Sequence, residues 1–207
     1  MMDDINNTSF PLTIIEWFKG LKNDTLLKEH QLYVIEYIKK YNGILIQHDL
    51  GTGKSLIAAF ILAHYVNDKQ VIFLSNKTLQ LNMQKTIEEY EKYKYENIKK
   101  NYAFITMNAN NMITQIDNFI NPINVFDNEY KIASNLDLDD KVLIVDEAHN
   151  LFNSVTNGST NALLLYNSIM KSKSLKIVFL SGTPIINHPF ELVPCFNMIA
   201  RKEVLPT

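Results

Sequence analysis

Residues 43–55 read GILIQHDLGTGKS, in which an apolar run leads into a glycine-rich turn. Gly51 and Gly53 let the backbone turn its N–H groups inward, where they can cradle phosphate oxygens. A phosphate-binding loop needs a strand before it and a helix after it, and the flanking residues fit both. His48 stands where this motif normally has Gly or Ala. We therefore expect a nucleotide to bind here, while His48 is open to either a functional role or packing in the turn.

Four more apolar runs follow along the chain, at residues 71–74, 102–106, 142–145 and 177–180. All are continuously apolar rather than alternating, as parallel strands covered on both faces require. Helical patterns occupy residues 26–41, 54–66 and 78–93. The sum predicts an α/β fold of three layers, with a mainly parallel central sheet between helices. Residues 1–25 are interpreted as an extension containing one helix, and the Asn- and Asp-rich residues 108–140 give no assignment.

The composition is that of an ordinary globular domain. Of 207 residues 46% are hydrophobic, and no apolar run is long enough to cross a membrane. The polar, acidic start lacks the layout of a signal peptide. Cys195 is the only cysteine, so we expect a buried small side chain and a reducing, intracellular setting. Arg201 is the only arginine among 20 basic residues and the net charge is −2, so the overall charge gives no signal for nucleic acid.

A second motif, residues 142–149, reads VLIVDEAH and delivers two carboxylates at the end of an apolar strand. In a parallel sheet, chemistry is carried out at this edge. Asp146 is expected to hold Mg²⁺ opposite Ser55, and Glu147 to orient and deprotonate an attacking water. His149, with no second His or Cys at ligand spacing, is expected to relay the nucleotide state. The alternative is a solvated acidic turn.

A third motif follows the last apolar run and reads SGTPIINHPFEL at residues 181–192. Its small residues Ser181, Gly182 and Thr183 can contact both the acidic strand end and a neighbouring lobe, and Pro184 stiffens the segment. Taken alone, the segment would more often be an ordinary Ser-Gly-Thr-Pro turn.

The order of these motifs, with KEHQ at residues 28–31 ahead of the loop, resembles the superfamily 2 helicases and ATPases of the Snf2-like branch. The segments at 104–109 and 190–197 look like the helicase-like ATPases of large DNA viruses, the group of the poxvirus nucleoside triphosphate phosphohydrolase I and early transcription factor small subunit. The resemblance covers about residues 26–199. It implies that residues 26–207 form the first RecA-like, ATP-binding lobe of a P-loop NTPase.

The resemblance implies ATP and Mg²⁺ as cofactors and assigns residues to them. The expected nucleotide contacts are Gln31, Leu50, Gly51, Thr52, Gly53, Lys54 and Ser55. The expected metal ligands are Ser55 and Asp146, and the expected catalytic residues are Lys54, Asp146 and Glu147. Coupling of hydrolysis to lobe movement is assigned to His149, Ser181, Gly182 and Thr183. Gln31 would read the adenine edge; its alternative is a polar position on a helix surface.

Nucleic-acid contacts are implied at two strand ends, on Asn76, Lys77 and Thr78 and on Asn108. The alternatives are a polar helix cap with Thr78 as the N-cap, and a plain loop at Asn108. The family branch favours DNA over RNA as the partner.

The resemblance also implies a second RecA-like lobe in the same longer polypeptide, carrying an arginine finger, and transcription machinery as a further partner. Without that lobe the chain should bind ATP yet hydrolyse it slowly. The expected setting is the cytoplasm of an infected cell or a virion. A non-catalytic, nucleotide-dependent binding module is the alternative function. A P-loop kinase is disfavoured because its lid needs basic residues and arginine is nearly absent.

Overall fold

The computed structural model describes residues 27–48, 51, 53–94, 98–122, 135–185 and 188–205. Within them lies one sheet of five parallel strands in the order β1-β5-β4-β2-β3. The strands are β1 (Gly43–Gln47), β2 (Val71–Ser75), β3 (Tyr102–Thr106), β4 (Val142–Asp146) and β5 (Lys176–Ser181). Each agrees with a predicted apolar run to within about a residue at either end. The predicted helix in residues 1–25 lies outside the described residues.

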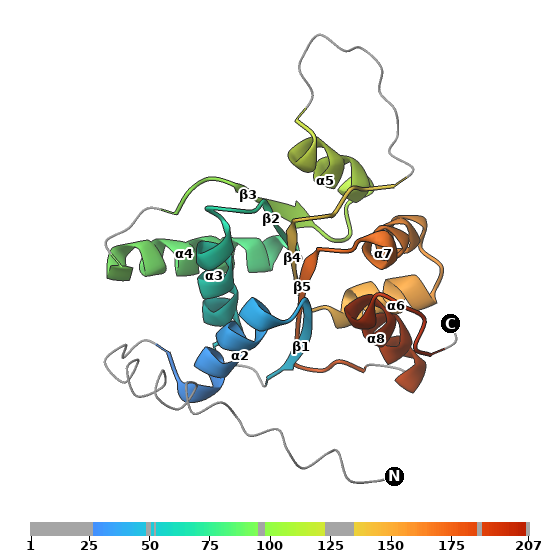
Figure 1. The fold of residues 1–207 in the computed structure, drawn as a ribbon, viewed down its shortest axis with the longest axis horizontal. Helices are drawn as coiled ribbons and strands as arrows, with labels where there is room; N and C mark the ends of the chain where they lie inside the picture. The colour runs from blue at the N-terminus through green and yellow to red at the C-terminus, as the bar shows by residue number, and fades with distance from the viewer. Residues whose placement is uncertain are drawn as a thin grey trace.

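Helices cover both faces of the sheet (Figure 1). On one face lie α2 (Glu29–Lys40), α3 (Lys54–Tyr65) and α4 (Lys77–Lys94). On the other lie α5 (Met112–Ile120), α6 (His149–Thr156), α7 (Thr160–Lys171) and, after the 3-10 turn η2 (Pro189–Glu191), α8 (Leu192–Ala200). The predicted three-layer α/β fold with a parallel sheet is therefore confirmed.

Two hydrophobic cores result, one on each face of the sheet. In β4, Val142 and Ile144 pack with the α2–α4 side, whereas Leu143 and Val145 pack with the α5–α8 side, and all four are buried. A strand covered on both faces needs an apolar side chain at every position. This requirement explains why residues 142–145 show no alternation of apolar and polar residues.

Helix α5 lies in the segment for which the sequence gives no assignment. It buries Met112, Ile113, Ile116 and Ile120 in the core on its side of the sheet. Three of these residues recur at i, i+4 and i+8, which is the spacing of one helix face. The Asn-rich flanks favour turns, and they obscure a helical period only nine residues long.

A lysine secures the amino end of β5 to the end of α2. Lys176 Nζ donates hydrogen bonds to the carbonyl oxygens of Ile38 (2.9 Å) and Tyr41 (3.1 Å) and to Asn42 Oδ1 (3.2 Å). A cation at this position also interacts favourably with the negative end of the α2 dipole. Polar groups at this edge of the sheet therefore join elements together.

Cys195 behaves as the sequence predicts. Its side chain is fully buried in α8, and burial raises the pKa of the thiol to about 12, so it is an unreactive packing residue. No helix in the described ranges is long and apolar enough to cross a membrane.

Candidate nucleotide site

Three strand ends meet at one edge of the sheet. β5 lies between β1 and β4 and pairs with both, with Gln47 opposite Ser181 and Asp146 opposite Leu180. The glycine-rich loop follows β1, the third motif follows β5 and the paired acids follow β4. The structure thus brings the three motifs together, although they are far apart in the chain.

The glycine-rich loop leads into α3, and its lysine folds back onto the start of the loop. Gly51 and Gly53 have φ values of +79° and +85°, a conformation that only glycine adopts freely. Lys54 is the first residue of α3, and its Nζ donates a hydrogen bond to the His48 carbonyl oxygen at 2.7 Å. The lysine charge is therefore held inside the loop, where a phosphate would lie.

His48 is integrated into the turn. Its N–H donates to the Ser181 carbonyl oxygen at 3.2 Å, which extends the β1–β5 ladder by one bond. Its ring packs edge-on against the ring of His30, with centroids 5.1 Å apart. These contacts support the packing interpretation of His48.

Gln31 lies against the loop and is only 3% exposed. Its Oε1 accepts the Lys28 N–H at 2.8 Å, and its Nε2 is 3.5 Å from the Gly53 carbonyl oxygen. The alternative of a helix-surface position is therefore wrong, while the reading of adenine stays a prediction. A Cβ at position 53 would lie 2.3 Å from the Gln31 amide nitrogen, so this contact also requires glycine. The predicted contacts Leu50 and Thr52 lie outside the described residues.

Asp146 ends β4 and is 7% exposed. Burial and the charge of Glu147 raise the pKa of its carboxyl to about 6, although the Glu147 N–H, 3.0 Å from Oδ1, and the Lys54 charge act in the opposite direction. Glu147 has a φ of +50°, which is uncommon for a residue with a side chain and is found at functional sites. A fully solvated acidic turn does not fit this burial.

His149 joins the second and third motifs. Its Nδ1 lies 3.0 Å from Ser181 Oγ and 3.3 Å from Glu147 Oε2. Ser181 is fully buried, so its hydroxyl is held in this position. A change at the Glu147 carboxylate can therefore reach β5 through one imidazole ring.

The rest of the third motif borders the lysine. A Cβ at Gly182 would lie 3.7 Å from Lys54 Nζ, so the absence of a side chain there leaves space beside the ammonium group. Thr183 comes next and is exposed at the edge of the sheet. Of the predicted coupling residues, His149 contacts Glu147, Ser181 contacts His149 and Gly182 borders Lys54.

The oxygen donors near the loop fit a hard divalent cation. Asp146 offers carboxylate oxygens, and Ser55, half-buried in the first turn of α3, offers a hydroxyl. Mg²⁺ prefers oxygen ligands and usually keeps waters and phosphate oxygens beside one or two protein ligands. A cation here would also stabilise the ionised form of Asp146. In the part of the chain that the structure describes, no three His, Cys, Asp or Glu side chains form a metal cluster.

The predicted nucleic-acid contacts lie at the same edge, on the other side of β4. Asn76, Lys77 and Thr78 follow β2, and Asn108 follows the neighbouring strand β3. Lys77, Thr78 and Asn108 are exposed. The two strand ends are tied together, because the Met107 N–H donates to the Ser75 carbonyl oxygen at 3.0 Å.

The prediction of Thr78 as a helix cap is wrong. α4 begins at Lys77, and the Asn76 carbonyl oxygen accepts the N–H groups of Leu79 (3.0 Å) and Gln80 (3.2 Å). Thr78 is therefore inside the first turn. Asn76 is the residue before the helix, where asparagine is among the preferred residues.

The single arginine lies at the opposite edge of the sheet. Arg201 donates hydrogen bonds to the carbonyl oxygens of Leu175, just before β5, and Met198, near the end of α8. Burial lowers the pKa of its guanidinium to about 10. It caps a helix and does not reach the phosphate loop.

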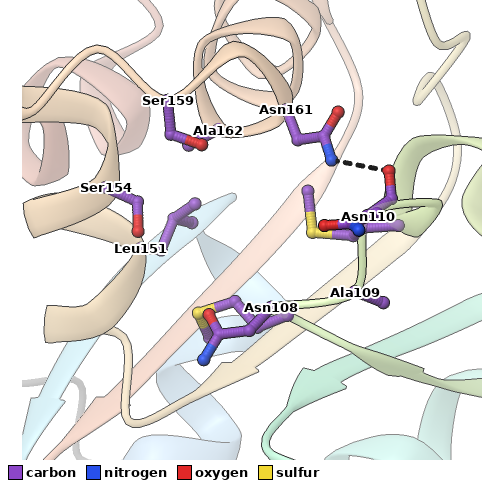
Figure 2. A pocket seen from close by; sticks show the side chains of 10 residues that line it. Asn108, Ala109, Asn110, Leu151, Ser154, Ser159, Asn161 and Ala162 are labelled. Carbon is purple, nitrogen blue, oxygen red and sulfur yellow. Dashed lines mark hydrogen bonds between the residues drawn. The ribbon is translucent and has the colours of Figure 1, made fainter.

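Three polar residues near Asn108 were not predicted as site residues from the sequence. Ser154 on α6, Ser159 before α7 and Asn161 on α7 surround a cavity beside it (Figure 2). In the sequence they are ordinary Asn and Ser residues in a polar stretch after the acidic motif, so no spacing marks them.

Comparison with known protein families agrees with this architecture. The family described as "Type III restriction enzyme, res subunit" matches residues 17–186. The chain belongs to this family. The predicted membership of the helicase-like ATPases of superfamily 2 is thereby confirmed.

Relatives of the chain occur in large DNA viruses, as predicted. It is 32% identical to the "Termination factor NPH-I homolog" of African swine fever virus (isolate Tick/Malawi/Lil 20-1/1983), over 97% of this chain and 32% of that protein. It is 29% identical to the "Early transcription factor 70 kDa subunit" of Fowlpox virus (strain NVSL), over 93% of this chain and 29% of that protein. The chain thus spans about a third of the length of these relatives.

Solved structures show the same fold at low sequence identity. A Sulfolobus solfataricus SWI2/SNF2 ATPase core in complex with dsDNA matches with a TM-score of 0.55 and 15% identity, over 84% of this chain and 36% of that one. The Pyrococcus furiosus Hef helicase domain matches with a TM-score of 0.51 and 16% identity, over 84% of this chain and 37% of that one. The predicted RecA-like architecture is confirmed.

Proposed function

We propose that this chain is the ATP-binding lobe of a nucleic-acid-dependent ATPase, which hydrolyses ATP with Mg²⁺ to move on or remodel a nucleic acid. The observation that carries the proposal is the link between the second and third motifs, in which His149 contacts both Glu147 and Ser181. An acid joined in this way to a neighbouring strand suits an enzyme that couples hydrolysis to movement. Membership of a helicase-like family supports the same conclusion.

In this proposal ATP binds over the loop that follows β1. Backbone N–H groups of the glycine-rich loop at Gly51 and Gly53 and the positive end of α3 cradle the phosphates. Lys54 neutralises the β- and γ-phosphates, and exchanges its bond to the His48 carbonyl oxygen for a phosphate oxygen. Gln31 reads the adenine edge, which is consistent with its position beside Gly53.

Ser55 and Asp146 hold Mg²⁺, which would supply positive charge at the phosphate oxygens. Glu147 orients a water for attack on the γ-phosphorus and accepts its proton as the bond to ADP breaks. Protonation removes the negative charge that faces His149 at 3.3 Å. The His149 ring then changes its contacts. The hydrogen bond between its Nδ1 and Ser181 Oγ carries this change to the end of β5.

The nucleic acid runs along the same edge, past Asn76, Lys77, Thr78 and Asn108, and we propose DNA. The SWI2/SNF2 core with a similar fold is described in complex with dsDNA. Relatives carry the names of a termination factor and an early transcription factor, which favours a role in viral transcription in the infected cell or virion.

A second RecA-like lobe completes the site in the proposed enzyme. Arg201 is bonded to backbone oxygens at the other edge of the sheet, so the arginine that stabilises phosphoryl transfer has to come from elsewhere. Gly182 and Thr183 lie at the edge that would face such a lobe.

Calorimetric titration of the 207-residue chain with Mg-ATP tests the nucleotide site. We expect saturable binding, at least about tenfold weaker in Lys54→Ala because a charge-assisted phosphate contact is lost. Lys85→Ala, at an exposed position of α4, is the control and should bind like the unmodified chain. A folded chain that gives no heat with Mg-ATP would contradict the proposal.

Turnover is tested on the longer polypeptide that carries the second lobe, with and without DNA. We expect DNA to raise the rate, and Glu147→Gln to lower kcat by about 10²–10⁴ while ATP binding is kept. Glu88→Gln, at an exposed position of α4, is the matched control. Tight ATP binding with no turnover in the longer polypeptide would favour the non-catalytic binding module instead.

A further inference from the structure

A cavity of about 210 Å³ opens at the carboxyl edge of the sheet, beside the end of β3. Figure 2 shows it between the segment that follows β3, helix α6 and the start of α7. None of the loop residues or acids of the nucleotide site is among its described lining residues. It is therefore a separate feature of the same edge.

The walls of the cavity combine neutral polar groups with apolar surface. Polar groups come from Asn108, Asn161, Ser154 and Ser159 and make up most of the lining, while Met107, Ala109 and other apolar residues supply a smaller apolar part. No described lining residue carries an ionisable side chain. The lining offers hydrogen bonds and some apolar surface, and it fits a neutral group with apolar faces and a polar edge.

The volume of the cavity limits the size of the group that can bind there. Pockets for drug-sized ligands measure about 300–1,000 Å³, whereas a single water needs only about 30 Å³. A cavity of about 210 Å³ accommodates one or two fused rings. Thioether groups pack well against aromatic rings, and amides such as that of Asn pair with the edges of bases. A nucleobase meets all of these requirements.

The cavity lies beside the proposed path of the nucleic-acid strand. Asn108 forms part of its wall and is also one of the residues past which the strand is proposed to run. The opposite walls are held together, because Asn161 Nδ2 donates to the Asn110 carbonyl oxygen at 3.0 Å. The opening is thus preformed rather than created by the ligand.

We propose that this cavity receives one unstacked nucleobase from the strand that crosses the edge of the sheet. The inference rests on the proposed nucleic-acid function and adds that the strand is unpaired at this point. Removing a base from a duplex stack costs a few kcal/mol, and least where the base is already single-stranded. The chain should therefore prefer single-stranded or locally melted DNA to a stable duplex.

The test compares two single strands of equal length at one salt concentration, a homopolymer that carries bases and a wholly abasic strand. Both have the same backbone charge, so non-specific attraction is matched. We expect the 207-residue chain to bind the base-bearing strand at least about fivefold more tightly, because only that strand can place a base against the amides in the cavity. A strand with 2-aminopurine in place of its bases should become more fluorescent on binding.

Ser154→Leu fills the cavity and should abolish both the preference and the fluorescence change. Thr156→Leu, on the exposed side of the same helix, is the matched control and should keep both. Ser154→Ala, which removes only the hydroxyl, serves as a second variant if the leucine lowers the melting temperature, and should reduce the preference.

The outcomes separate this inference from the proposed function. Equal affinity for both strands, or an unchanged preference in a folded Ser154→Leu chain, would overturn the base pocket and leave backbone binding intact. Binding of neither strand would overturn both. A duplex bound more tightly than the single strand would also contradict the pocket.

Discussion

Asp139 lies just before β4 and Asp146 is the last residue of that strand, and the pKa values of their carboxyl groups are shifted in opposite directions. Asp139 Oδ1 accepts hydrogen bonds from Ser172 Oγ (2.7 Å) and from the N–H groups of Lys173 (2.6 Å) and Ser174 (3.1 Å). These bonds lower its pKa to about 2. Burial and the charge of Glu147 raise the pKa of Asp146 to about 6. The Asp139 carboxylate thus accepts several hydrogen bonds that join two segments, whereas the Asp146 carboxyl is buried beside a like charge, and we propose that it binds a cation.

The same contrast extends to the two edges of the sheet. At the amino edge Lys176 and Arg201 bond to backbone oxygens and connect helices to strands. At the carboxyl edge Lys54 and His149 bond to groups within the motifs themselves. Polar residues at the first edge should therefore matter for stability, and those at the second for binding and catalysis.

The largest effect is expected for Asp146→Asn. Loss of a carboxylate beside a bound cation removes about 2–3 kcal/mol of charge interaction, which weakens Mg-ATP binding by about 30- to 160-fold. Asp139→Asn should leave this affinity unchanged. Calorimetric titration with ATP, in the presence of Mg²⁺ and in the presence of a chelator, measures the affinity of both variants. An equal loss of affinity in Asp146→Asn and Asp139→Asn would contradict the difference between the two carboxyl groups.

Lys176→Met should be the most destabilising change at the amino edge. It keeps the apolar stem but leaves the carbonyl oxygens of Ile38 and Tyr41 without their charged donor, a loss of about 2 kcal/mol in the free energy of unfolding. Urea unfolding measures it, with Lys202→Met, an exposed position, as control. The affinity for Mg-ATP should not change in Lys176→Met. A large change in that affinity would show that the amino edge of the sheet influences binding at the carboxyl edge.

Gly53→Ala should weaken nucleotide binding by about tenfold, because the new Cβ combines backbone strain with displacement of Gln31. Gly158→Ala is a matched control: its φ is +75°, yet nothing lies within 4 Å of the added Cβ. Both variants should lose stability in thermal melts, Gly53→Ala the more because it also displaces Gln31. Only the first should lose affinity in calorimetry, so equal affinities would show that the Gln31 contact is dispensable.

The smallest effect concerns the pH dependence of stability through Asp139. Its pKa is lowered from 3.8 to about 2 in the folded chain, so its contribution is fully present above pH 3.8 and is lost as the pH falls through 2. Asp139→Asn lacks this contribution. The difference in melting temperature between the two chains should be constant near neutral pH and shrink below pH 3.8. A pH-independent gap for Asp139→Asn would refute the linkage.

The strands and the motif positions could be predicted because their signals are local. Residues 142–145 are apolar at every position since both faces of β4 are covered, and the DEAH tetrapeptide follows directly. The burial of Gln31 also has a sequence signal, because Gln31, Ile35 and Ile38 recur at helical spacing on the buried face of α2. That periodicity favours a buried glutamine over the helix-surface alternative.

Other features depend on contacts that no local pattern encodes. The cavity beside Asn108 exists because α7, more than 50 residues later in the chain, packs against the segment after β3, as the bond from Asn161 to Asn110 shows. The left-handed conformation of Glu147 and the opposite pKa shifts of Asp139 and Asp146 are likewise set by tertiary packing. Both aspartates have similar acidic neighbours in the sequence, so composition does not distinguish them.

The position of β5 has a consequence for biosynthesis. In the described sheet β1, which leads into the phosphate loop, pairs with β5, the last of the five strands to be translated. A ribosome must therefore release nearly all of the described chain before β1 finds a neighbour, and until then its backbone is an open edge for other chains. We therefore expect that a polypeptide still on the ribosome binds ATP only after residues 176–181 have been synthesised and have paired with β1.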